Sequence, residues 1–348
     1  MIQEWLILSY IGFIYRLFVS LFINLIVDYS NFLSYNNIML KFENVTKYYH
    51  SYRAINFLDY NFNSNRIAIY GENGSGKSTF LRLCSGMEDV TAGKILLNDN
   101  PIEISKNTYF TFREGGLINK TVKENLFYPL KIRNEDNIEN RVEKLLVEFD
   151  LKQVENTKLK LLPFEERARL ILAKIKLRKT DILLIDNPFE SLDKHTRNDY
   201  FNWFLDLIKD YEGLVIYSTD IKKELQFFNE IVLLNYGFVK GVGQYDEVFS
   251  NPFNIFTYSF FEELKLFNGR IYMDNEDMYF KEKEQKIKLS NVVSSRIIKQ
   301  FIPMDCVLAV KESVVKKLGK NMQSIELTDL ENYEDIWLFD WNENSIIK

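Results

Sequence analysis

The chain has 348 residues, 46% of them hydrophobic and 27% charged, with a formal net charge of −5. This composition excludes an intrinsically disordered chain, and the length predicts two domains of ordinary size. Nucleic acid is not an expected partner, because a protein that binds the phosphate backbone needs a basic surface. The two cysteines, Cys84 and Cys306, are too few for a disulfide framework and are expected to be small buried residues in a reducing compartment.

The first 37 residues form an apolar segment whose role the sequence leaves open. Polar residues are rare from Trp5 to Val27, and this length could span a bilayer, although Arg16 would then lie near the middle of the span. No small-residue cleavage pattern of a signal peptide follows. The alternatives are a membrane anchor, an amphipathic surface helix, or a start codon assigned too early, since Met39 opens an alternating strand of its own.

From Ile38 onward, short apolar strands alternate with longer helical stretches, which predicts an α/β layered domain over residues 38–250. Gly237 is expected to turn the chain into Phe238 and Val239, giving a hairpin at the edge of the sheet. The expected buried strands are Ile67–Tyr70, Ile182–Ile185, Leu214–Tyr217 and Ile231–Leu234, and the expected helices are Lys77–Ser85, Asn137–Phe149, Glu165–Arg178 and Thr196–Lys209.

A domain boundary is expected near Asn251 and Pro252. Beyond it, residues 254–348 are rich in strand-forming segments separated by charged turns, which predicts a smaller β-rich accessory domain.

The strongest local motif is the run Gly71-Glu-Asn-Gly-Ser-Gly-Lys-Ser-Thr79, which follows a buried strand and opens a helix. Its glycines let the backbone N–H groups curl around phosphates, and the helix adds the positive end of its dipole. Lys77 is expected to place its charge on the β- and γ-phosphates. The sequence therefore predicts a nucleoside triphosphate site that includes Gly71, Asn73, Gly74, Ser75, Gly76, Lys77, Ser78 and Thr79.

A second motif supports the same site. The apolar strand Ile182–Ile185 ends in Asp186, a carboxylate suited to the shell of a Mg²⁺ ion beside the phosphate loop. Ser78 and Asp186 are the predicted metal ligands.

The run Asp186-Asn-Pro-Phe-Glu-Ser-Leu-Asp193 resembles the Walker B and D-loop segment of ABC transporter ATPases. Val45–Tyr49, Thr121–Leu126 and Gly237–Gly243 with Glu247 resemble further family segments in the right order, and the resemblance covers Met39 to Ser250. It implies a P-loop NTPase of ABC type with a helical subdomain, ATP and Mg²⁺ as ligands, and Tyr49 stacked on adenine. It also implies a homo- or heterodimer of ATP-binding domains that works with a membrane permease at the cytoplasmic face of the membrane.

The departures from the family pattern all fall at hydrolytic or γ-phosphate-sensing positions. Asn187 replaces the glutamate that polarises the attacking water, and an amide cannot accept a proton. Asp220, or Thr219 with one residue gapped, replaces the switch histidine. Arg113 replaces the Q-loop glutamine, and Leu162-Pro-Phe-Glu-Glu166 replaces the Leu-Ser-Gly-Gly-Gln signature. The resemblance therefore implies a subunit that binds ATP with hydrolysis weak or absent.

Two other functions stay open at this point. The chain could be a non-transport switch in which ATP stabilises a closed dimer, or it could hydrolyse ATP slowly through a non-standard residue such as Glu190 or Asp220. The substrate is also open. Phe112–Ile118 with Glu124–Leu130 is similar to ATPases of lipid-trafficking systems, whereas Phe261–Met273 and Cys306–Val310 are similar to the small β-barrel of sugar and solute importer ATPases.

Overall fold

The computed structural model describes residues 38–103, 108–111, 117–177, 180–297, 303–331 and 333–340. The apolar segment of residues 1–37 and Arg113 lie outside these described residues, so the predictions made for them stay predictions. Met39–Lys348 forms one compact unit. Among the described residues, no helix combines the length and the apolar character that crossing a bilayer requires.

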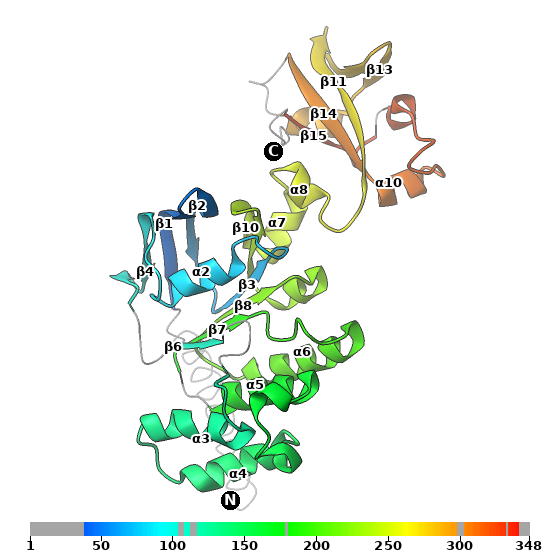
Figure 1. The fold of residues 1–348 in the computed structure, drawn as a ribbon. Helices are drawn as coiled ribbons and strands as arrows, with labels where there is room; N and C mark the ends of the chain where they lie inside the picture. Colours follow the sequence, from blue (N-terminus) through cyan, green and yellow to red (C-terminus); the bar gives the residue numbers. More distant parts are fainter. Residues whose placement is uncertain are drawn as a thin grey trace, which may run out of the picture. The chain divides into compact units, whose positions relative to one another are not determined.

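The larger sheet of the described chain has ten strands in the order β5-β4-β1-β2-β10-β9-β3-β8-β7-β6 (Figure 1). The block β9-β3-β8-β7-β6 is parallel, and the block β5-β4-β1-β2 is antiparallel. The strand bounds are β1 Leu40–Tyr49, β2 Tyr52–Phe62, β3 Arg66–Tyr70, β4 Ala92–Leu97, β5 Asn100–Pro101, β6 Thr108–Thr111, β7 Ile182–Asp186, β8 Leu214–Thr219, β9 Glu230–Asn235 and β10 Phe238–Gln244.

The central parallel strands are buried along almost their whole length, as expected for strands covered on both faces. All four strands predicted as buried are present as β3, β7, β8 and β9, which confirms the α/β fold class. The carboxyl ends of β3 and β7 meet at one edge of this block, because β8 pairs in register with both of them. That edge is where the phosphate loop begins.

The predicted position of the Gly237 hairpin at the sheet edge is wrong. Strand β10 is antiparallel to β9 and lies between β9 and β2, so the hairpin is inside the ten-stranded sheet. It joins the parallel block to the antiparallel block through the pair of Phe238 and Asn56. A β9–β10 turn looks like an edge hairpin in the sequence because the pairing partner of β10 is far away in the chain.

Helices follow the predicted segments closely. Helix α3 begins with a reciprocal capping box between Thr121 and Glu124, and α6 is capped by Asp193, whose carboxylate accepts from the backbone N–H groups of His195 and Thr196. The helices up to the boundary region are α2 Lys77–Cys84, α3 Val122–Ile132, α4 Ile138–Glu148, α5 Phe164–Leu177, α6 Lys194–Ile208, α7 Tyr245–Ser250 and α8 Ile255–Tyr258.

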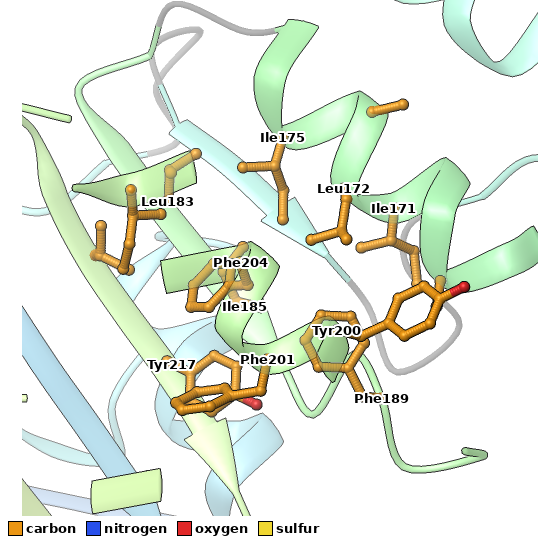
Figure 2. Close-up of a cluster of buried hydrophobic side chains, with 14 of the residues drawn as sticks. Ile171, Leu172, Ile175, Leu183, Ile185, Phe189, Tyr200, Phe201, Phe204 and Tyr217 are labelled. Carbon is orange, nitrogen blue, oxygen red and sulfur yellow. The ribbon is translucent and has the colours of Figure 1, made fainter. Parts of the chain in front are cut away.

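The core beside the site is built by α5, α6, β7 and β8 (Figure 2). Ile171 and Ile175 of α5 belong to the same buried cluster as Leu183 and Ile185 of β7, and Phe201 and Phe204 of α6 contact the ring of Tyr217 of β8. The ring of Phe204 stacks on that of Tyr217 with a centroid distance of 5.1 Å. This packing fixes α6 against the ends of β7 and β8, and so fixes the polar side chains that α6 carries at its N-terminal end.

A second, smaller sheet follows the first along the chain. It has five antiparallel strands within the described residues, in the order β13-β12-β11-β14-β15, around a separate apolar core that includes Phe280 and Leu308. This small antiparallel sheet agrees with the predicted β-rich accessory part of the fold. Its elements are β11 Leu264–Asp274, β12 Asp277–Glu282, β13 Gln285–Lys288, α9 Asn291–Arg296, β14 Met304–Lys311, α10 Glu312–Lys317 and β15 Trp337–Phe339.

Candidate nucleotide-binding site

A pocket of about 230 Å³ lies between the loop that joins β3 to α2 and the carboxyl end of β7. Most of the residues predicted to contact nucleotide come together here, together with one aromatic residue that the sequence analysis did not single out, Tyr52. The lining residues are Tyr52, Asn73, Gly74, Ser75, Gly76, Lys77, Ser78, Thr79, Asp186 and Asn187.

The backbone of the loop needs glycine at two positions. Gly74 and Gly76 have φ angles of +82° and +110°, where L side chains are strained. A Cβ on Gly76 would lie 2.2 Å from the carbonyl oxygen of Ala54, whereas one on Gly74 would meet open space. The loop is also braced from the β9–β10 turn, where the Gly237 N–H donates to the Ser75 carbonyl over 3.0 Å. The loop is therefore a preformed cradle with room above Gly74.

The polar groups of the cradle fit a phosphate chain. The Lys77 ammonium is almost fully buried and donates to the carbonyl oxygens of Gly71 and Glu72 over 2.5 and 3.0 Å. The Ser75 hydroxyl is buried and has no hydrogen-bond partner among the described residues. A buried hydroxyl and a buried cation that face a small pocket are the groups that an oligophosphate would satisfy.

Asp186 is placed for a divalent cation. It ends β7, is 3% exposed, and accepts a hydrogen bond of 2.8 Å from the Ser218 hydroxyl on the neighbouring strand β8. Its backbone N–H donates to Thr111 Oγ1 over 2.9 Å. Asp186 and Ser78, the predicted metal ligands, line the same pocket, and their side-chain oxygens are the kind of ligand that Mg²⁺ prefers.

Asn187, which directly follows Asp186, carries an amide and has no carboxylate. It is 1% exposed, and its φ of +41° is one that Asn tolerates better than most residues. Its Oδ1 accepts from Arg197 Nη2 over 3.0 Å, while its backbone N–H is shared between Ser218 O and Ser218 Oγ at 3.2 and 3.1 Å. Its side-chain Nδ2 is buried without a partner among the described residues.

Arg197 of α6 is the centre of a buried ionic network that the sequence analysis missed. Its guanidinium donates to Glu224 Oε1 and to Thr219 Oγ1, each over 3.0 Å, in addition to Asn187. Glu224 also accepts from the Tyr217 hydroxyl over 3.0 Å. Burial by itself lowers the pKa of Arg197, but the hydrogen bond and charge of Glu224 outweigh it, and the pKa of Arg197 is raised above its ordinary value.

Asp220 belongs to the same network. Its Oδ1 lies 2.9 Å from Arg197 Nη1, close enough for an ion pair although the angle is not that of a hydrogen bond. Asp220 directly follows β8, and Thr219, the gapped alternative, is instead buried and hydrogen-bonded within the network. The charge of Asp220, the residue predicted to replace the switch histidine, is therefore compensated by a cation of the same chain.

Several known proteins are similar to this chain in sequence or fold. A family model for the ABC transporter matches residues 58–190. The chain is 30% identical over 249 residues to the sulfate/thiosulfate import ATP-binding protein CysA of Methylococcus capsulatus, covering 67% of this chain and 71% of that protein. It is 29% identical over 249 residues to the protein of the same name from Nitrosomonas europaea, covering 67% of this chain and 68% of that protein.

The chain belongs to the ABC transporter ATP-binding family. Solved structures show the same fold: cbiO1 from Clostridium perfringens, part of the complex cbiONQ, aligns with a TM-score of 0.51 at 20% identity over 62% of this chain and 92% of that chain. The dimeric bacterial ABC transporter cassette MJ0796 aligns with a TM-score of 0.51 at 23% identity over 59% of this chain and 98% of that chain. The resemblance stated from the sequence is thereby confirmed.

Leu162–Glu166, the segment predicted to replace the ABC signature, leads into helix α5. Leu162 is buried, whereas the Phe164 side chain is 56% exposed and the Arg167 guanidinium lies 5.5 Å from the centre of its ring. Glu165 and Glu166 occupy the first turn of the helix, where an ABC signature would present hydroxyl and N–H donors. Their negative charge at this end of α5 is unfavourable for a phosphate.

Tyr49 and Tyr52 are the two candidates for an aromatic side chain that would stack on adenine. Tyr49, the predicted platform, ends β1, and its hydroxyl donates to the carboxylate of Glu88. Tyr52 opens β2, is 49% exposed, and its hydroxyl donates to the carbonyl of Gly74 in the phosphate loop. Only Tyr52 of the two lines the described pocket, so the role of Tyr49 stays a prediction.

The residues that the sequence analysis missed are identifiable only in part from sequence signals. Ser218 lies opposite Asp186 because β7 and β8 pair in register, and this pairing could have been inferred from two adjacent parallel strands. Arg197 lies one helical turn after the N-cap Asp193, on the buried side of α6. Its partner Glu224 comes from a 3₁₀ turn, Lys222–Phe227, which carries no hydrophobic periodicity that would have placed it.

Proposed function

We propose that this chain is the ATP-binding subunit of an ABC import system in which Mg·ATP binding acts on a membrane permease while hydrolysis is weak or absent. Its named relatives are import ATP-binding proteins for sulfate and thiosulfate, which favours import of a small solute over the lipid-trafficking alternative. The dimeric state of MJ0796 supports action as a pair of ATP-binding domains.

The observation that carries weak hydrolysis is the arrangement of Asn187, Arg197 and Asp220. The position of the water-activating glutamate holds an amide, and the position of the switch histidine holds a carboxylate that lies against Arg197. A positioned general base contributes about 10²–10⁴-fold in rate. The Asp220 carboxylate is instead engaged in an ion pair with Arg197.

The cradle supports binding without supplying hydrolysis. Lys77 and the N–H groups of the phosphate loop hold the phosphates, and Ser78 with Asp186 would hold Mg²⁺, which neutralises charge between the β- and γ-phosphates when bound. Asn187 and Ser218 keep Asp186 in position through the strand-end hydrogen bonds. None of these groups removes a proton from water.

The test is steady-state phosphate release from the purified chain, alone and with its membrane partner, beside calorimetric ATP binding. We expect tight ATP binding that Lys77→Ala abolishes, with phosphate release about 10²–10⁴-fold below that of a family member with the glutamate. Asn187→Glu should restore little, because Leu162–Glu166 would still lack signature donors. Turnover of 1 s⁻¹ or more that disappears in Lys77→Ala would overturn the proposal.

The partner is tested separately. Purification of the native complex from membranes, followed by mass spectrometry, should identify a permease with the chain. Recovery of the chain as a dimer with a soluble regulatory protein, and no permease, would support a non-transport switch instead.

A further inference from the structure

The hydrogen bond from Arg197 fixes which end of the Asn187 amide faces the guanidinium. An amide carries one accepting oxygen and one donating nitrogen, and a guanidinium carries only donors. The group that faces Arg197 Nη2 at 3.0 Å must therefore be the Asn187 oxygen, because two donors cannot bond to each other. The Asn187 Nδ2 amino group is left pointing away from Arg197.

This amino group has nothing to bond to in the described part of the protein. Asn187 is 1% exposed, lines the phosphate pocket together with Lys77 and Asp186, and its Nδ2 is one of the buried polar atoms without a partner. A buried N–H that lacks a partner is unfavourable, so such a group is a candidate contact for a ligand. The buried, unpartnered Ser75 hydroxyl lies on the loop side of the same pocket.

We infer that Asn187 donates a hydrogen bond from Nδ2 to a terminal phosphate oxygen of bound ATP, and so makes this site select ATP over ADP. The inference rests on the proposed function. A glutamate at this position would present negative charge to the phosphate, whereas the oriented amide presents the positive end of a dipole. The substitution thus converts a position for activating water into one for holding the triphosphate.

Arg197 is the positioning residue for this contact. It reaches Asn187 from α6 and is itself fixed by Glu224, Thr219 and Asp220, so the amide cannot turn over without losing its bond to the guanidinium. A ground-state contact of this kind strengthens ATP binding without lowering the barrier to hydrolysis, because it does not grow stronger in the transition state.

The experiment compares ATP and ADP affinity of the full chain by calorimetry, with Mg²⁺ present. Asn187→Leu removes the donor, and Asn187→Asp replaces it with an acceptor of the same shape. We expect both to weaken ATP binding about tenfold to a hundredfold, the range of a hydrogen bond to a charged group, with ADP affinity changed less than about twofold. Asn140→Leu is the matched control, because the same change removes an exposed amide of α4 that is not part of the pocket lining, and it should keep the wild-type ATP to ADP ratio.

Arg197→Lys tests the positioning role. Lysine keeps the positive charge but lacks the planar fork of donors, so we expect the ATP to ADP ratio to fall toward that of Asn187→Leu. If Asn187→Leu kept the wild-type ATP to ADP ratio, the inference would be overturned. An equal loss of both affinities would show a merely structural role, and no loss of either would show that Nδ2 does not contact the nucleotide. If wild type bound ATP no better than Lys77→Ala, the proposed function would fail as well, so the two failures are distinguishable.

Discussion

The Arg197 network should dominate the stability of the ATP-binding domain, and Arg197→Met tests this directly. The Arg197 and Glu224 side chains are each 7% exposed, so methionine would leave the Glu224 carboxylate buried without a cation. Removing one partner of a buried ion pair costs about 3–5 kcal/mol, because the remaining charge is uncompensated. Arg197→Met should lose more unfolding free energy than Glu224→Gln, since in Glu224→Gln the Arg197 guanidinium keeps Asp220 as an ion-pair partner at 2.9 Å.

Urea unfolding followed by far-ultraviolet circular dichroism measures the effect. With an m value of about 3 kcal/mol per molar urea, a loss of about 3–5 kcal/mol lowers the midpoint by roughly 1–1.7 M. The double variant Arg197→Met with Glu224→Gln should recover part of this loss, because neither buried charge remains and glutamine can still accept from Tyr217. Lys152→Met is the matched control, since it removes a cation from an exposed pair with Glu143 and should leave the midpoint unchanged.

The pH dependence of this contribution follows from the direction of the pKa shift. A group with a raised pKa in the folded state contributes stability below its unfolded pKa and loses it only as pH rises through the folded pKa. Because the pKa of Arg197 is raised from an already high value, the difference between wild type and Arg197→Met should stay constant across neutral and moderately alkaline pH. A midpoint change no larger than that of Lys152→Met would refute the reasoning that this network is a buried, paired charge.

Further predictions concern the glycine cradle and the two thiols. Gly76→Ala should lower the thermal midpoint and ATP affinity far more than Gly74→Ala, because a Cβ on Gly76 meets the Ala54 carbonyl at 2.2 Å whereas Gly74 adds only the left-handed backbone penalty of about 1–2 kcal/mol. Equal effects in the two variants would show that the close approach is unimportant. Burial raises the pKa of the Cys84 thiol well above its ordinary value and that of Cys306 to about 12, so neither should react with a thiol reagent at pH 8 until the protein is denatured. Stoichiometric labelling of the native chain would contradict the buried positions.

What the sequence determined is the part of the site built from consecutive residues. The glycine loop from Gly71, its lysine and the strand ending at Asp186 each form one local motif, and local geometry fixes how such residues meet a phosphate. The parallel strands could also be predicted from the sequence, because strands buried on both faces are continuous apolar runs.

The tertiary structure alone decided which side chains surround Asn187. Arg197 of α6 lies 22 residues before Thr219 and 27 before Glu224, and no motif in the chain relates it to them. The position of β10 inside the sheet was also decided there, since its second neighbour β2 lies far earlier in the sequence. Local motifs fix local geometry, whereas hydrogen bonds between distant segments depend on how the packed core brings the ends of strands and helices together. The amide at Asn187 could therefore be found in the sequence, but its orientation could not.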